Sequence, residues 1–209
     1  GRDMQISENL KKLPNRITMF RIIITFAFIP AILAERLMWN YAALGIFLIA
    51  SISDFLDGYL ARKYNIISVF GQVMDPLADK ILVLAALLCF VHLQVAPVWM
   101  VIIIISREFF VSGIRTMAAQ QGKIIAASKW GKLKTATEMT AISATLLLIS
   151  IHKTLAHYQI KQGEFMDISP ETWMLKLIPY ILFFIAASFS LISGLEYFFK
   201  NKSIFESEF

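Results

Sequence analysis

The sequence predicts an all-α, polytopic membrane protein with six transmembrane helices, and composition and patterning are the two observations behind this prediction. Hydrophobic residues make up 57% of the chain and charged residues 17%, whereas soluble domains are about half apolar and about a quarter charged. The mean hydropathy is +0.65, and the apolar residues form long blocks. A helix needs about 20 apolar residues to cross the hydrocarbon core of a bilayer. The expected spans are residues 17–34, 40–61, 71–93, 97–119, 128–151 and 172–199.

These spans form one expected membrane domain, residues 17–199, between two polar ends. Residues 1–16 precede it as an N-terminal segment, and residues 200–209 follow it as a tail. Residues 1–3 stand ahead of Met4 and are expected to be a cloning remnant. The longest internal polar stretch, residues 152–171, is expected to be a loop facing away from the cytoplasm.

Lysine and arginine are concentrated in alternate connections, which predicts the orientation of the chain. Cytoplasmic loops of membrane proteins carry an excess of these residues. Both termini are therefore expected in the cytoplasm, with the protein integral to a membrane that it crosses several times. The basic-rich segments hold Arg2, Lys11, Lys12, Arg16 and Arg21, then Arg62 and Lys63, then Arg115, Lys123, Lys129, Lys132 and Lys134, and finally Lys200 and Lys202.

Four aspartates lie at the cytoplasmic ends of the second and third expected spans, where ionisable groups are costly and indicate function. Asp54 and Asp57 are three residues apart, and Asp75 and Asp79 are four apart, so each pair shares one helical face. Carboxylates at close range repel one another, and bound metal is the simplest way to neutralise them. An all-oxygen set of ligands favours Mg²⁺ or Mn²⁺ over zinc, and four carboxylates suit two ions.

Neighbouring residues fit a phosphate-bearing ligand at the same place. Gly58 and Gly71 carry no side chain where a bulky ligand would approach the backbone. Arg62 follows Gly58 by one helical turn and suits a phosphate. The aspartate spacing by itself leaves two alternatives, a helix end followed by a turn and a cation site in a transporter.

The complete pattern resembles the signature of the CDP-alcohol phosphotransferase family, D-x-x-D-G-x-x-A-R-x8-G-x-x-x-D-x-x-x-D, without any departure. It runs from Asp54 to Asp79, with Ala61 and the residues named above at the other fixed positions. Further stretches resemble one branch of that family, the phosphatidylglycerophosphate synthases. They are residues 13–18, 75–80, 106–109, 112–115, 131–135 and 193–197.

The resemblance implies a six-helix homodimer that joins CDP-diacylglycerol and sn-glycerol 3-phosphate, giving phosphatidylglycerophosphate and CMP. It implies two divalent cations, Mg²⁺ or Mn²⁺, and a cavity that opens to the cytoplasm. By position, Asp79 would be a metal ligand and also the general base for the acceptor hydroxyl. The other implied metal ligands are Asp54, Asp57 and Asp75, and the implied CDP-lipid contacts are Gly58, Arg62 and Gly71, with Asn15 and Ser68 as weaker candidates.

The acceptor phosphate is a dianion and needs fixed positive charge, which the fourth and fifth expected spans offer. The candidates are Arg107, Arg115, Lys132 and Lys134. Arg107 falls inside an apolar run, and its alternative role is an ion pair with Glu108 or Glu138. The basic residues of this region have a second alternative, which is to set topology and contact anionic lipid.

Other functions stay open at this point. The same chemistry with another acceptor would make a cardiolipin, phosphatidylserine or phosphatidylinositol phosphate synthase, and a transporter would release no CMP. His92, His152 and His157 lie in or near connections on the other side and are expected to be surface residues. Cys89 is the single cysteine and is expected to be a small buried apolar residue.

Overall fold

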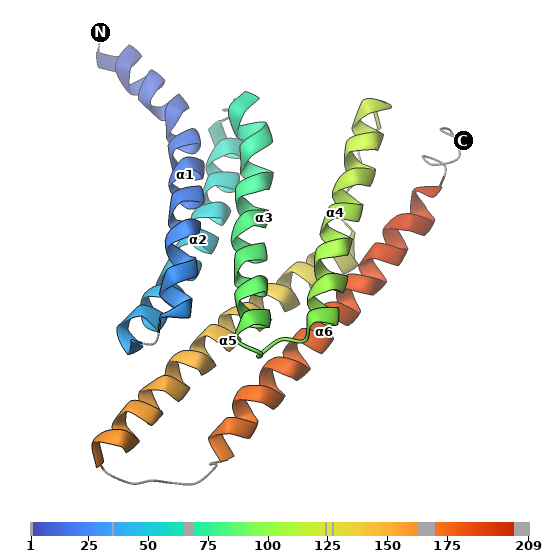
Figure 1. Cartoon of the computed structure of the whole chain (residues 1–209). Coiled ribbons are helices and arrows are strands. Elements are labelled where there is room, and N and C mark those ends of the chain that lie inside the picture. Colours follow the sequence, from blue (N-terminus) through green and yellow to red (C-terminus); the bar gives the residue numbers. More distant parts are fainter. Residues whose placement is uncertain are drawn as a thin grey trace. The chain divides into compact units, whose positions relative to one another are not determined.

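In the residues that it describes, the computed structural model consists of α-helices joined by short turns and connections, with no strand (Figure 1). It describes residues 2–34, 36–64, 69–123, 125–126, 128–162 and 170–202, and side chains except at 2–17, 54–64, 69–73, 75–76, 79, 159–162 and 170–174. The helices are α1 (Arg2–Leu33), α2 (Leu37–Tyr64), α3 (Val69–His92), α4 (Val98–Gln120), α5 (Lys129–Gln162) and α6 (Pro170–Lys200). The predicted all-α class is therefore confirmed.

Four helices agree with the expected spans within a few residues, whereas α1 and α5 extend further. Helix α1 begins at Arg2, fifteen residues before the first expected span (17 − 2 = 15). Helix α5 continues through residues 152–162, which we expected as part of a loop, and that expectation is wrong for this portion. Residues 152–162 contain no Gly or Pro, so no residue there interrupts the backbone hydrogen bonding of the helix.

In the part of the chain that the structure describes, two segments have the length and composition of membrane spans, Lys129–Tyr158 and Leu175–Lys200. Shorter apolar helical segments occur at Thr18–Leu33, Leu37–Ser53 and Lys80–His92 within the described residues. Large apolar side chains are also exposed to a degree that water would disfavour, with Met38 at 83% and Phe199 at 69%. These features indicate a membrane protein, while six crossings stay a prediction.

The chain divides into two compact units. The first comprises residues 1–89 and 149–163, and the second comprises residues 90–148 and 164–209. Helix α5 therefore contributes its C-terminal part to the first unit and its N-terminal part to the second.

In the first unit, α1 lies beside α2 (Figure 1). Phe28 and Phe47 are buried at this contact, with ring centroids 6.3 Å apart. At the end of α1, Lys153 of α5 donates hydrogen bonds to the Ala34 carbonyl oxygen at 3.0 Å and to Asn40 Oδ1 at 3.2 Å. The last carbonyl groups of a helix have no hydrogen-bond donor within the helix. Lys153 supplies a donor for the Ala34 carbonyl at the end of α1.

In the second unit, α4 lies beside α6 (Figure 1). Met100 and Ile104 of α4 and Phe183 and Ala186 of α6 are fully buried. Phe183 also contacts Phe90, with ring centroids 5.6 Å apart. This apolar packing holds α4 against α6.

Candidate functional site

The aspartates of the signature lie on α2 and α3, in the first unit. Asp54 and Asp57 fall one turn apart on α2, and Asp75 and Asp79 fall one turn apart on α3. The helical placement that their spacing predicted is therefore observed in the backbone. The side chains of all four aspartates lie outside the described residues, as do those of Asn15, Arg62 and the whole of Ser68. Gly58 and Gly71 lie on α2 and α3 respectively.

The donor set of these aspartates fits divalent metal ions. All four donors are carboxylates, hard oxygen ligands of the kind that Mg²⁺ and Mn²⁺ prefer. The helical period places the two positions of each pair on one face of their helix. Among the residues whose side chains are described, no group of three or more His, Cys, Asp or Glu residues could hold a metal ion.

A cluster of charged side chains is buried in the second unit, and Glu108 of α4 is at its centre. Glu108 Oε1 accepts hydrogen bonds from Arg107 Nη1 at 2.9 Å and from Lys134 Nζ of α5. Lys134 also contacts Glu138 Oε2 at 2.5 Å, one turn further along α5. The side chains of Lys134 and Glu138 are 1% and 4% exposed. The two cations and two carboxylates balance, which is the condition for burying charge without a large penalty.

Arg107 lies in a slot between helices that two glycines leave open. A Cβ atom at Gly194 of α6 would lie 3.3 Å from Arg107 Cγ, and one at Gly131 of α5 would lie 3.4 Å from Arg107 Nη2. The distance at Gly194 is tighter than an ordinary contact, so the absence of a side chain there makes room for the arginine. At Gly131 the nearest atom would be Ser128 Oγ at 3.3 Å, with Arg107 next to it. Its Nη2 donates a 2.6 Å hydrogen bond to Ser193 Oγ. Both terminal nitrogens of Arg107 are therefore engaged within the protein.

Arg115 lies two turns beyond Arg107 on α4 and contacts Tyr197 of α6. Its Nη2 donates a hydrogen bond to the Tyr197 hydroxyl oxygen at 2.7 Å, and its guanidinium carbon lies 5.5 Å from the centre of the ring. Arg115 is exposed, and so is Lys132 of α5. Of the four candidate acceptor residues, the structure thus joins Arg107 and Lys134 through Glu108 and leaves Arg115 and Lys132 accessible.

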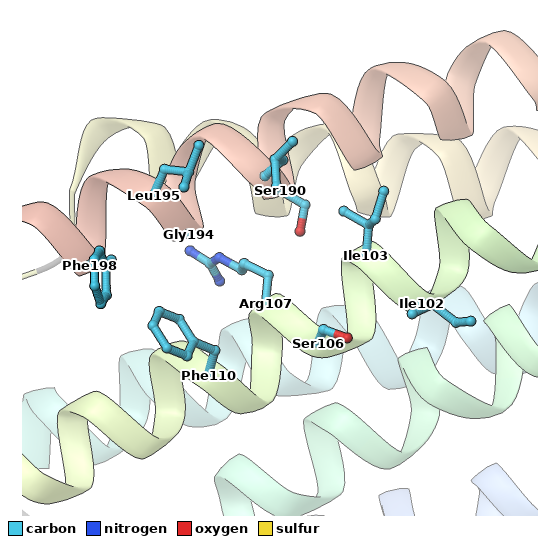
Figure 2. A pocket seen from close by; sticks show the side chains of 10 residues that line it. Ile102, Ile103, Ser106, Arg107, Phe110, Ser190, Gly194, Leu195 and Phe198 are labelled. Atoms are coloured by element: carbon cyan, nitrogen blue, oxygen red, sulfur yellow. The ribbon is translucent and has the colours of Figure 1, made fainter.

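An open groove of about 570 Å³ runs between α4 and α6 on the side of Arg107 (Figure 2). Its lining is apolar apart from Arg107, Ser106 and Ser190. Figure 2 shows Arg107 reaching from α4 toward Gly194 of α6, with Phe110 and Phe198 at one end of the groove. An apolar groove of this kind suits lipid chains better than a charged acceptor.

Several polar residues of this region were not predicted as site residues. Ser193 accepts a hydrogen bond from Arg107 and Tyr197 accepts one from Arg115. In the sequence, both residues were noted only as part of a stretch that resembles the family.

Arg21 of α1, in the first unit, is 1% exposed, whereas in the sequence it counted only among the basic residues that set topology. Its position inside the apolar run of α1 was the available signal, because a charge in such a run has to be accommodated by the interior.

The histidines and the cysteine lie much as expected. His92 and His157 are exposed, and His152 is partly exposed. Cys89 is buried and has a free thiol. None of the four takes part in the charged cluster that the structure describes.

Comparison with known proteins agrees with the motifs. The model of the family described as CDP-alcohol phosphatidyltransferase matches residues 11–166. Three similar proteins, from Bacillus subtilis, Mycoplasma pneumoniae and Rickettsia typhi, are named CDP-diacylglycerol–glycerol-3-phosphate 3-phosphatidyltransferase. Their identities to this chain are 39%, 31% and 35% over 202, 201 and 200 residues, covering 90%, 88% and 94% of this chain and 94%, 84% and 100% of theirs.

Proposed function

Because the chain belongs to the CDP-alcohol phosphatidyltransferase family, we propose that it transfers the phosphatidyl group of CDP-diacylglycerol to sn-glycerol 3-phosphate. The products are phosphatidylglycerophosphate and CMP, and the enzyme serves phospholipid biosynthesis. The complete signature from Asp54 to Asp79 carries this proposal. The names of the relatives support the acceptor.

The reaction is a substitution at the β-phosphorus of the CDP-lipid. A new P–O bond forms to the acceptor hydroxyl oxygen, the bond to the bridging oxygen breaks, and CMP leaves. Asp79 takes the proton from the hydroxyl, which is a weak nucleophile until it is deprotonated. Asp54, Asp57 and Asp75 together with Asp79 would hold two Mg²⁺ or Mn²⁺ ions. Bound there, the ions supply positive charge that neutralises the diphosphate and the leaving group.

The remaining residues of the signature would bind the CDP-lipid. Arg62 contacts a phosphate, for which its planar fork of donors is suited. Gly58 and Gly71 allow the CDP group to approach the backbone of their helices. Asn15 and Ser68 are additional contacts for the same group.

For the acceptor, we assign direct phosphate contacts to Arg115 and Lys132, because both are exposed. Arg107 and Lys134 belong to the same set of basic residues. They are engaged with Glu108 and Glu138 in a cluster whose charges balance, so their contribution is to the position of α4 against α5. Charge-assisted hydrogen bonds of this kind are each worth about 1.5–3 kcal/mol.

The reaction itself is tested by measuring CMP release from CDP-diacylglycerol by the purified protein. The acceptors offered are glycerol 3-phosphate, phosphatidylglycerol, serine and inositol phosphate. We expect release with glycerol 3-phosphate far above the others. Preference for another acceptor would assign a different branch of the family, and no release with any acceptor would favour the transporter alternative.

Arg115→Ala is expected to raise the KM for glycerol 3-phosphate about tenfold, because about 1.4 kcal/mol corresponds to a factor of ten. The KM for CDP-diacylglycerol should change far less. Steady-state kinetics with each substrate varied in turn measure both. Lys123→Ala is the matched control, since Lys123 is also exposed and basic but lies outside the proposed contacts. An unchanged acceptor KM in the Arg115 variant would remove this residue from the site.

We also propose six membrane crossings, a homodimer, and both termini in the cytoplasm. Helix α5 allows a direct test, since its 34 residues extend about 51 Å at 1.5 Å per residue. In a Cys89→Ala background, single cysteines at Lys129 and Gln162 are labelled with an impermeant reagent added to intact cells. Only the cysteine at position 162 should react. Labelling at position 129 would reverse the orientation.

A further inference from the structure

Tyr197 connects three parts of the second unit through one side chain. It lies on α6 and is 2% exposed. Its hydroxyl oxygen accepts the hydrogen bond from Arg115 of α4 and donates one to the Ala126 carbonyl oxygen at 3.3 Å. Ala126 belongs to the connection between α4 and α5. The hydroxyl is thus used in both directions, once as acceptor and once as donor.

The ring of Tyr197 also lies within reach of two guanidinium groups. The guanidinium carbon of Arg107 is 5.8 Å from the ring centroid, and that of Arg115 is 5.5 Å from it. Cations within about 6 Å of an aromatic centroid are attracted by the ring. Two arginines that lie two turns apart on α4 therefore both contact one aromatic side chain.

The two arginines differ in how many of their hydrogen-bond donors stay available to a ligand. Arg107 has both terminal nitrogens bonded inside the protein and a side chain that is 10% exposed. Arg115 uses Nη2 for Tyr197 and is otherwise exposed. An exposed arginine samples many rotamers and loses that freedom when it binds a ligand, unless a partner holds it in advance.

We propose that Tyr197 is a positioning residue for the acceptor: its hydroxyl holds the Arg115 guanidinium in the orientation that receives the phosphate of the acceptor alcohol. This inference rests on the proposed acceptor role of Arg115. The tyrosine does not touch the reacting atoms. It lowers the conformational cost of phosphate binding, while its second hydrogen bond ties Ala126 to α6.

Tyr197→Phe tests the role of the hydroxyl, since it removes one oxygen atom and keeps the ring with both cation contacts. We expect the KM for glycerol 3-phosphate to rise about fivefold, with kcat and the KM for CDP-diacylglycerol within about twofold of the parent. Tyr180→Phe on the same helix is the matched control, because Tyr180 is exposed. A purely structural role would lower the melting temperature and affect both substrates alike, which would overturn the proposal.

A double-mutant cycle with Arg115→Ala separates positioning from other effects of the hydroxyl. If Tyr197 acts through Arg115, adding Tyr197→Phe to Arg115→Ala should change the acceptor KM by less than about twofold. A full additional fivefold rise would overturn positioning through Arg115. If Arg115→Ala alone leaves the acceptor KM unchanged, the proposed acceptor site itself fails. If that variant raises KM and Tyr197→Phe does not, only the positioning role fails.

Discussion

Asp79→Asn is expected to reduce CMP release by roughly 10²–10⁴-fold, the contribution typical of a general base in a positioned site. The amide keeps the size and shape of the carboxylate but cannot accept the proton of the acceptor hydroxyl. The loss should therefore appear in kcat. Binding of the CDP-lipid should be retained to an appreciable degree, since the other aspartates and Arg62 are unchanged.

Single-turnover CMP release and equilibrium binding of CDP-diacylglycerol measure the two properties separately. Asp167→Asn is a suitable control, because Asp167 is an aspartate outside the signature. Removal of divalent ions with EDTA should also abolish release by the parent protein, and added Mg²⁺ or Mn²⁺ should restore it. Substantial turnover by the Asp79 variant would show that another group removes the proton.

The positions of the helices could be predicted from sequence because the apolar runs are long and continuous. Helices α2, α3, α4 and α6 begin and end within three residues of the expected spans. The extension of α5 beyond residue 151 was not predicted. Hydropathy locates the end of the apolar run, whereas the helix ends only where its backbone hydrogen bonding stops. Residues 152–162 mix polar and apolar side chains and contain no Gly or Pro, so the helix can continue through them.

The signature could be predicted to lie on two helices because its spacing is local, with members three or four residues apart. The contacts of the second unit are not local. Glu108 meets Lys134 across 26 residues, and Arg115 meets Tyr197 across 82. The sequence offered Glu108 and Glu138 as alternative partners of Arg107. The observed Arg107–Glu108 pair, with Lys134 bridging Glu108 and Glu138, depends on how α4 packs against α5.

The slot around Arg107 likewise depends on contacts between residues far apart in the sequence, so it could not be predicted from local spacing. Gly131 and Gly194 stand within stretches that resemble the family, but nothing local assigns them a partner. A Cβ atom at Gly194 would crowd Arg107 Cγ at 3.3 Å, whereas one at Gly131 would meet Ser128 Oγ at 3.3 Å and Arg107 Nη2 at 3.4 Å. A small residue in a membrane helix is ordinarily a place where another helix or side chain approaches closely. Which group approaches is decided by packing.

Lys134→Met is expected to lower the free energy of unfolding by about 3–5 kcal/mol, the usual effect of removing one partner of a buried ion pair. The methionine fills a similar volume, so packing is nearly conserved. Glu138 loses the cation at 2.5 Å, and its Oε1 already has no hydrogen-bond partner in the described structure. Two carboxylates then face Arg107 alone, leaving one buried negative charge uncompensated.

The second substitution Glu138→Gln distinguishes this charge effect from a packing defect. In the Lys134→Met, Glu138→Gln double variant the cluster is neutral again, with Arg107 balancing Glu108. We expect it to recover at least half of the lost stability, since a neutral amide is far less costly to bury than an unpaired carboxylate. Unfolding in detergent micelles measures each variant, with Lys129→Met as the exposed control on the same helix. A double variant as unstable as Lys134→Met alone would show that the lysine stabilises the helices by its shape and contacts instead of its charge.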